Sequence, residues 1–155
     1  MQIVAKFKIN PEMIIESHGL EDGGAVQKFI DQECIRLMDP YTPDLNGVLK
    51  QSVRINTVIG SGKLVQATPY ARYDYYGVLF VDPITLKGSF YNSKTGRHWS
   101  RKGVSKIPDP KGRMLQFNKV KSPNAGPHWF ERMVADHGDE IGRGAAKIAG
   151  GRFVK

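Results

Sequence analysis

Residues 22–40 read DGGAVQKFIDQECIRLMDP and contain the clearest helix signal of the chain. Apolar side chains recur there at the spacing of one helix face, and polar side chains fill the opposite face. The apolar positions are Val26, Phe29, Ile30, Cys34, Leu37 and Met38. Asp22 is expected as the N-cap, and Pro40 ends the helix because the residue before a proline disfavours helical dihedral angles. The pattern predicts an amphipathic helix followed by a loop over residues 41–47.

A second helical pattern follows Pro127. Its apolar side chains again trace one helix face, and they are Trp129, Phe130, Met133, Val134, His137, Ile141, Ala145 and Ile148. Glycines at positions 138, 142 and 144 interrupt this pattern, and each costs a helix about 1 kcal/mol relative to alanine. We therefore expect this helix to depend on tertiary packing, with residues 149–155 as a tail.

Shorter patterns flank the first helix. Residues 3–9 alternate apolar and polar side chains, which predicts a half-buried strand. Asn10-Pro11-Glu12 then predicts the start of a short helix, with Asn as N-cap and Pro at the first helical position. Residues 49–59 and 63–67 are expected to be strands joined by a turn at Gly60-Ser61-Gly62.

The part of the chain before the last helix has weaker patterns. Residues 69–77 favour a short helix, and residues 78–81 favour a buried strand. From residue 82 to 126 only residues 114–117 resemble a strand, so a long loop is expected there. Strands do not alternate regularly with long crossover helices. The sequence therefore predicts one α+β domain over residues 1–155, a small mixed or mainly antiparallel sheet with helices packed on one face.

Length and composition exclude several classes of protein. The chain has 155 residues, of which 40% are hydrophobic and 25% charged, as in ordinary single globular domains. No apolar stretch approaches the roughly 20 residues of a membrane span, and the first residues lack the pattern of a secretory signal. The single cysteine, Cys34, can form neither an internal disulfide nor a multi-cysteine zinc site. A reducing cytoplasm, or a particle assembled there, is the expected compartment.

The positive charge of the chain is concentrated in one segment. The net charge is +8, yet residues 87–121 alone contain ten Lys or Arg and one acid, Asp109. This basic segment is expected to be an extended loop that contacts DNA or an acidic protein partner, and a merely solvated loop is the alternative. The candidate contact residues are Lys94, Arg97, Arg101, Lys102, Lys106, Lys111 and Arg113, interleaved with Tyr91, His98 and Trp99.

No catalytic or cofactor-binding set emerges from the motifs. Gly60-Ser61-Gly62-Lys63 lacks the first glycine and the Ser or Thr of a phosphate-binding loop, so a turn is favoured. Histidines and acids near residues 128–140 lack the order and the partner helix of a metal centre, and His137 is expected in the core or at an interface. Cys34 is expected to be buried. The protein is therefore expected not to be an enzyme and to need no metal, cofactor or small-molecule substrate.

The stretch Pro69-Tyr-Ala-Arg-Tyr-Asp-Tyr-Tyr-Gly77 is the richest in aromatic residues. Its tyrosines could stack on bases while Arg72 contacts a phosphate. Tyrosine also combines a large apolar body with a polar tip, which suits a core that continues into a subunit interface. The second interpretation is favoured, and it involves Tyr70, Tyr73, Tyr75 and Tyr76.

Several segments together resemble a family of phage minor capsid proteins that includes head–tail neck, or tail-completion, proteins. Residues 19–52, GLEDGGAVQKFIDQECIRLMDPYTPDLNGVLKQS, are similar to the start of that family, with Asn46 in place of its usual Thr. Residues 69–77 match its Pro-Tyr-Ala-x-Tyr-x-Tyr-Tyr-Gly motif. Residues 129–133 and 144–147 fit its C-terminal helix. The basic segment and the first predicted strand are outside the resemblance.

The resemblance implies a structural protein of the virion of a tailed bacteriophage. Such a protein would assemble in the bacterial host cytoplasm as a homo-oligomeric ring in the neck. Its neighbours there would be the portal-side connector or stopper and the tail-terminator or tail proteins, around the DNA channel. The residues then expected at a subunit or partner interface are Tyr41, Pro43, Leu49, Tyr70, Arg72, Tyr73, Tyr75 and Tyr76. The alternative is a small non-specific nucleic-acid-binding protein that uses the basic segment.

Overall fold

The computed structural model of the protein describes residues 15–16 and 18–152. The strand predicted over residues 3–9 and the start of the helix predicted at Asn10 lie outside these residues. The elements, in chain order, are α2 (Ala25–Met38), α3 (Val48–Asn56), α4 (Ala71–Tyr76), β1 (Phe80–Val81), β2 (Phe90–Asn92), β3 (Arg97–Trp99), β4 (Ile107–Pro108) and α5 (Trp129–Ile148).

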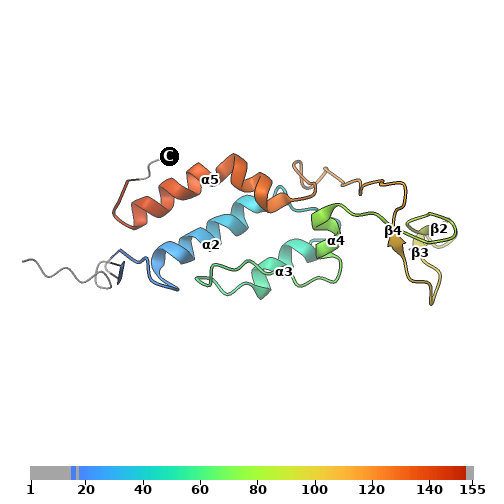
Figure 1. The fold of residues 1–155 in the computed structure, drawn as a ribbon, viewed down its shortest axis with the longest axis horizontal. Helices are drawn as coiled ribbons and strands as arrows, with labels where there is room; N and C mark the ends of the chain where they lie inside the picture. Colours follow the sequence, from blue (N-terminus) through green and yellow to red (C-terminus); the bar gives the residue numbers. More distant parts are fainter. Residues whose placement is uncertain (1–14, 17, 153–155) are drawn as a thin grey trace, which may run out of the picture.

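The predicted α+β class is confirmed. Within the described residues, helices combine with two antiparallel sheets of two strands each, β1–β4 and β2–β3. The two longest helices, α2 and α5, run antiparallel along each other, and the strands lie at the opposite end of the molecule from the last turn of α5 (Figure 1). The apolar faces of the helices are therefore buried mainly against each other.

The core forms where α2 and α5 meet the segments between them, and both predicted amphipathic helices are confirmed. Its buried cluster consists of Cys34, Leu37, Met38, Tyr41, Leu49, Val53, Ala71, Trp129, Met133 and Ile141. Gly144 has a packing role here, because a Cβ at this position would overlap the ring of Phe29 on α2. A glycine that weakens α5 as an isolated helix thus lets the two helices approach closely.

The glycine pair before α2 has a steric explanation. Gly23 has a φ of +75°, which is left-handed, and a Cβ on Gly24 would lie 2.5 Å from the carbonyl oxygen of Gly19. The N-cap is Gly24, which has no side chain to form a cap hydrogen bond. The prediction of Asp22 as N-cap is therefore wrong. The close approach of Gly24 to Gly19, rather than capping by a side chain, fixes where α2 begins.

The strand predicted over residues 49–59 is wrong, because helix α3 occupies most of this range. Leu49 and Val53 are four residues apart, and both are buried on the same helix face. Ile55 and Val58, which favoured a strand, are 70% and 73% exposed. Residues 63–67 form no strand, so the prediction of a strand there is also wrong, and the glycine turn at residues 60–62 follows a helix instead of joining two strands.

The long loop expected from residue 82 onward contains three short strands. The hairpin of β2 and β3 pairs Phe90 with Trp99 and Asn92 with Arg97, and Val81 of β1 lies opposite Ile107 of β4. We call residues 78–118 the arm. The strand predicted over residues 78–81 is confirmed in part as β1, and residues 114–117 contribute only a bridge at Met114. Each strand is two or three residues long, too short for a periodic pattern to predict it.

Candidate functional site: the basic arm and the tyrosine helix

Helix α4 confirms the short helix predicted within residues 69–77, and Gly77 ends it in the left-handed conformation. Tyr75 points inward: its ring meets that of Trp129 edge-on at 4.7 Å, and its hydroxyl donates a hydrogen bond to Glu131. Burial raises the pKa of the Tyr75 phenol, and the bond to Glu131 acts in the same direction. Tyr75 therefore ties α4 to the first turn of α5.

The other tyrosines of α4 and its N-cap lie at the surface. Tyr70, Tyr73 and Tyr76 are 39%, 46% and 50% exposed, and Arg72 is exposed beside them. Such exposed aromatic residues are enriched in protein interfaces. A contact with another chain through these residues stays a prediction.

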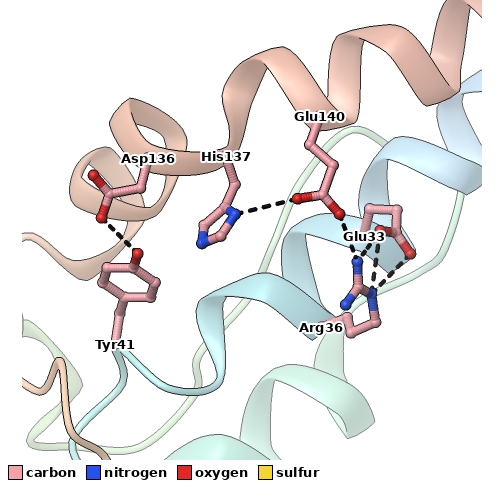
Figure 2. Close-up of polar contacts among 6 residues, drawn as sticks. All are labelled: Glu33, Arg36, Tyr41, Asp136, His137 and Glu140. Atoms are coloured by element: carbon pink, nitrogen blue, oxygen red, sulfur yellow. Dashed lines mark hydrogen bonds and ion pairs between the residues drawn. The ribbon is translucent and has the colours of Figure 1, made fainter.

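Tyr41 and Leu49 occupy the core instead of the surface. Tyr41 is 3% exposed and donates a 2.5 Å hydrogen bond to Asp136 on α5, while Leu49 is 4% exposed (Figure 2). The bond to Asp136 raises the pKa of the Tyr41 phenol. Pro43, close by, is half-buried. Tyr41 and Leu49 are thus too buried to contact another chain directly. They can contribute to an interface only by holding neighbouring surface residues in place.

Charged side chains join α2 and α5 at the edge of the core (Figure 2). Arg36 pairs with Glu33 at 2.6 Å and with Glu140 at 3.3 Å, and Glu140 lies 3.3 Å from Nδ1 of His137. The bond from Arg36 lowers the pKa of Glu33. Such exposed ion pairs contribute little to stability, typically below about 1 kcal/mol. This cluster is therefore a polar contact between α2 and α5.

Two observations concern the candidate metal ligands and the cysteine among the described residues. Over residues 15–16 and 18–152, no three His, Cys, Asp or Glu converge in a way that could hold a metal ion. Cys34 is buried, as predicted, and burial raises the pKa of its thiol. A raised pKa disfavours the thiolate that nucleophilic attack requires.

Three of the seven predicted cationic contact residues hold the arm together. Arg101 donates to the buried Asp82 with an Nε–Oδ2 distance of 2.7 Å, and Arg113 donates to the buried Asp109 at 2.6 Å. The ammonium of Lys106 donates to the carbonyl of Gly88. The Arg101 guanidinium lowers the pKa of Asp82, and that of Arg113 lowers the pKa of Asp109 to about 2. These cations therefore shape the arm before any partner binds.

The other four cations remain available to a ligand. The side chains of Lys94, Arg97, Lys102 and Lys111 are exposed, and none makes a hydrogen bond or ion pair with a described residue. Two aromatic pairs lie on the hairpin among them. Phe90 stacks on Trp99, and the ring of Tyr91 contacts that of His98 in a tilted arrangement. Tyr91 is 62% exposed and Trp99 is 50% exposed. Mobile cations beside exposed rings are the elements of non-specific nucleic-acid binding.

Asp31 is a structural residue that sequence reasoning missed. It is 3% exposed, and its Oδ2 accepts hydrogen bonds from the amides of Gly60 at 2.7 Å and Gly62 at 3.2 Å. Its Oδ1 accepts a third from Gln27 at 2.8 Å. The glycine turn that resembles part of a phosphate-binding loop thus binds a carboxylate of its own chain. Helical spacing placed Asp31 on the polar face, and only the fold brings the turn over it.

Comparisons with protein-family models, with curated proteins and with solved structures find no match for this chain. None of the helices in the described part of the chain has the length and apolar character needed to cross a membrane.

Proposed function

We propose that the protein is a structural component of a tailed-phage virion, forming a ring in the neck that joins the head to the tail around the DNA channel. The observation that carries the proposal is that the motif segments resembling the minor capsid family converge on one core. Tyr41 and Leu49 from the first motif pack in the same buried cluster as Ala71 from the tyrosine motif and Trp129 from the C-terminal motif.

Polar contacts between the same motif segments support this interpretation. Lys50 pairs with Asp39 at 2.7 Å, which joins residues 39–43 to residues 47–52 within the first similar segment. The hydroxyl of Tyr75 donates a hydrogen bond to Glu131, which joins the tyrosine motif to the C-terminal helix. Contacts between the motif segments are what we expect if the motifs belong to one structural unit.

The arrangement also suits assembly into a ring. A closed ring needs two different complementary surfaces on each subunit. This chain has an arm with unpaired cations at one end and exposed tyrosines on α4, next to the helical core. These surfaces differ in chemistry, as head-to-tail contacts between identical subunits require.

Deleting the gene from the phage or prophage that carries it tests the neck role. We expect electron micrographs of the lysate to show filled heads beside separate, finished tails, and a wild-type copy of the gene should restore joined particles. Purified virions should contain the protein at the neck only. Normal infectious particles without the gene would refute the proposal.

A second function, non-specific DNA binding by the arm, is favoured by the four unpaired cations beside Tyr91 and Trp99. It is compatible with the neck role, because a neck ring surrounds DNA. Each phosphate contact releases counterions, so the logarithm of the binding constant should fall linearly with the logarithm of the salt concentration.

Replacing Lys94, Arg97, Lys102 and Lys111 together with alanine should weaken duplex binding and reduce the salt slope by about 3 to 4, since each contact contributes about 0.9. Fluorescence anisotropy with a labelled duplex at several salt concentrations measures this slope. A matched control replaces Lys28, Lys63, Arg143 and Lys147, which are exposed cations outside the arm, and it should leave the slope unchanged. Equal effects of the two sets would exclude the arm as the binding surface.

A further inference from the structure

Asp74 on α4 lies where three hollows in the protein surface meet. Hollows of about 280 and 220 Å³ adjoin it on the side of residues 43–46, and both are lined by Pro43 and Leu45 as well as by Asp74. A wider hollow of about 750 Å³ continues between α4 and the arm, with Tyr73, Phe80 and Leu115 in its lining. We call these three together the Asp74 hollow. The lining is mainly apolar, and it includes a second acid, Asp44, whose carboxylate accepts a hydrogen bond from the amide of Gly47.

The carboxylate of Asp74 is half-buried and unpaired. It makes no hydrogen bond or ion pair with any described residue, and burial raises its pKa. Lys106 lines the same hollow, but its ammonium donates to the carbonyl of Gly88. Removing a carboxylate from water is unfavourable unless a cation or a donor compensates it. The Asp74 hollow therefore favours a positively charged group with apolar surface around it.

The rim of the hollow also offers apolar surface. Leu45 is 84% exposed and Tyr70 is 39% exposed. The long stem of an arginine packs well on such side chains, and its planar guanidinium can form two hydrogen bonds to one carboxylate. An arginine from another chain would satisfy both the charge and the shape of the site.

The arm of the same protein carries such an arginine. Arg97 begins β3 next to the hairpin turn, and its exposed guanidinium has no described partner. Figure 1 places the β2–β3 hairpin at the end of the molecule, beyond α4 and the helical core. The hairpin can thus extend toward a neighbouring molecule, and it leaves the Asp74 hollow of its own molecule open.

We propose that the β2–β3 hairpin of one copy docks in the Asp74 hollow of the next copy, with the Arg97 guanidinium paired to the Asp74 carboxylate. The two surfaces are different and complementary, so the contact is head-to-tail and can close into a ring. This inference rests on the proposed ring, and it identifies the two faces that would meet in it.

Reversing the charges of the pair tests the contact. The variants are Asp74→Arg, Arg97→Asp and the double variant, and the measurement is sedimentation equilibrium of the full chain at low salt over a wide concentration range. Each single variant should raise the dissociation constant of self-association by about tenfold or more, and the double variant should restore most of it. Lys119→Asp makes the same charge change at an exposed cation just outside the arm, and it should leave association unchanged.

Circular dichroism of each variant should match that of the wild type, which would distinguish lost association from lost structure. Wild-type protein that stays monomeric throughout, or a double variant that fails to recover, overturns the pairing. If Asp74→Arg prevents association and Arg97→Asp does not, a different cation occupies the hollow, and the proposed docking is wrong. The gene deletion tests the neck role separately, because a neck protein could assemble through other surfaces and these copies could associate outside a virion.

Discussion

Trp129→Ala is expected to lower the free energy of unfolding by about 3 to 5 kcal/mol, the usual cost of emptying a large aromatic site in a core. Trp129 is the first residue of α5 and is 1% exposed, so its ring fills space that no neighbour can easily reoccupy. Its loss would also remove the edge-on contact that anchors Tyr75 of α4. Because whole domains are stable by only about 5 to 15 kcal/mol, the variant should unfold at much lower urea concentration.

The chain contains one further tryptophan, Trp99, which provides the matched control. Trp99 lies on the arm hairpin, is 50% exposed and stacks on Phe90. Trp99→Ala should therefore cost about 1 kcal/mol or less in urea denaturation. Equal losses for the two variants would contradict a core centred on the start of α5.

Asp31→Ala is expected to cost about 2 to 4 kcal/mol, because it leaves the amides of Gly60 and Gly62 and the side chain of Gln27 without their acceptor. Asp31→Asn should cost clearly less. The asparagine oxygen can accept both glycine amides, and the Gln27 amide can rotate to present its oxygen to the asparagine NH₂ group. Urea denaturation measures both costs, and amide hydrogen exchange at Gly60 should accelerate in the alanine variant.

The comparison of the two Asp31 variants separates hydrogen bonding from charge. If asparagine were as harmful as alanine, the negative charge rather than the acceptor geometry would hold the glycine turn. Asp22→Ala, at an exposed acid before the same helix, is the control and should change stability by less than about 0.5 kcal/mol.

Helical spacing predicted the parts of the fold that are buried on one side over several turns. The helices α2 and α5 were predicted because their apolar spacing repeats over at least three turns. On α5, however, only Trp129, Met133 and Ile141 of the predicted apolar face are buried, whereas Phe130, Val134 and Ile148 are exposed. Residues 49–59 show why short segments fail: Val53 and Ile55 suggested a strand, but burial follows Leu49 and Val53, a helical spacing. The sequence contains both periods there, and only tertiary packing selects one.

The sequence also located the basic segment without revealing how its cations are used. Arg101 and Asp82 are 19 residues apart, so no local spacing predicts their ion pair. The same limit applies to the acids. Asp31 and Asp74 both lie in helices, yet one is enclosed by the donors of a distant turn and the other faces an open hollow. The position of a charge can be read from the chain, but its partner depends on the fold.

The ion pairs within the arm have a consequence for how this protein can change over time. Asp82 with Arg101 and Asp109 with Arg113 begin and end inside the arm, and none of these residues belongs to the buried cluster of the helices. The arm thus has stabilising ion pairs of its own, in addition to the packing that holds the helices together. A substitution that breaks one of these pairs should therefore disturb the arm more than the packing of the helices. The same helical base should then tolerate arms of different length or charge.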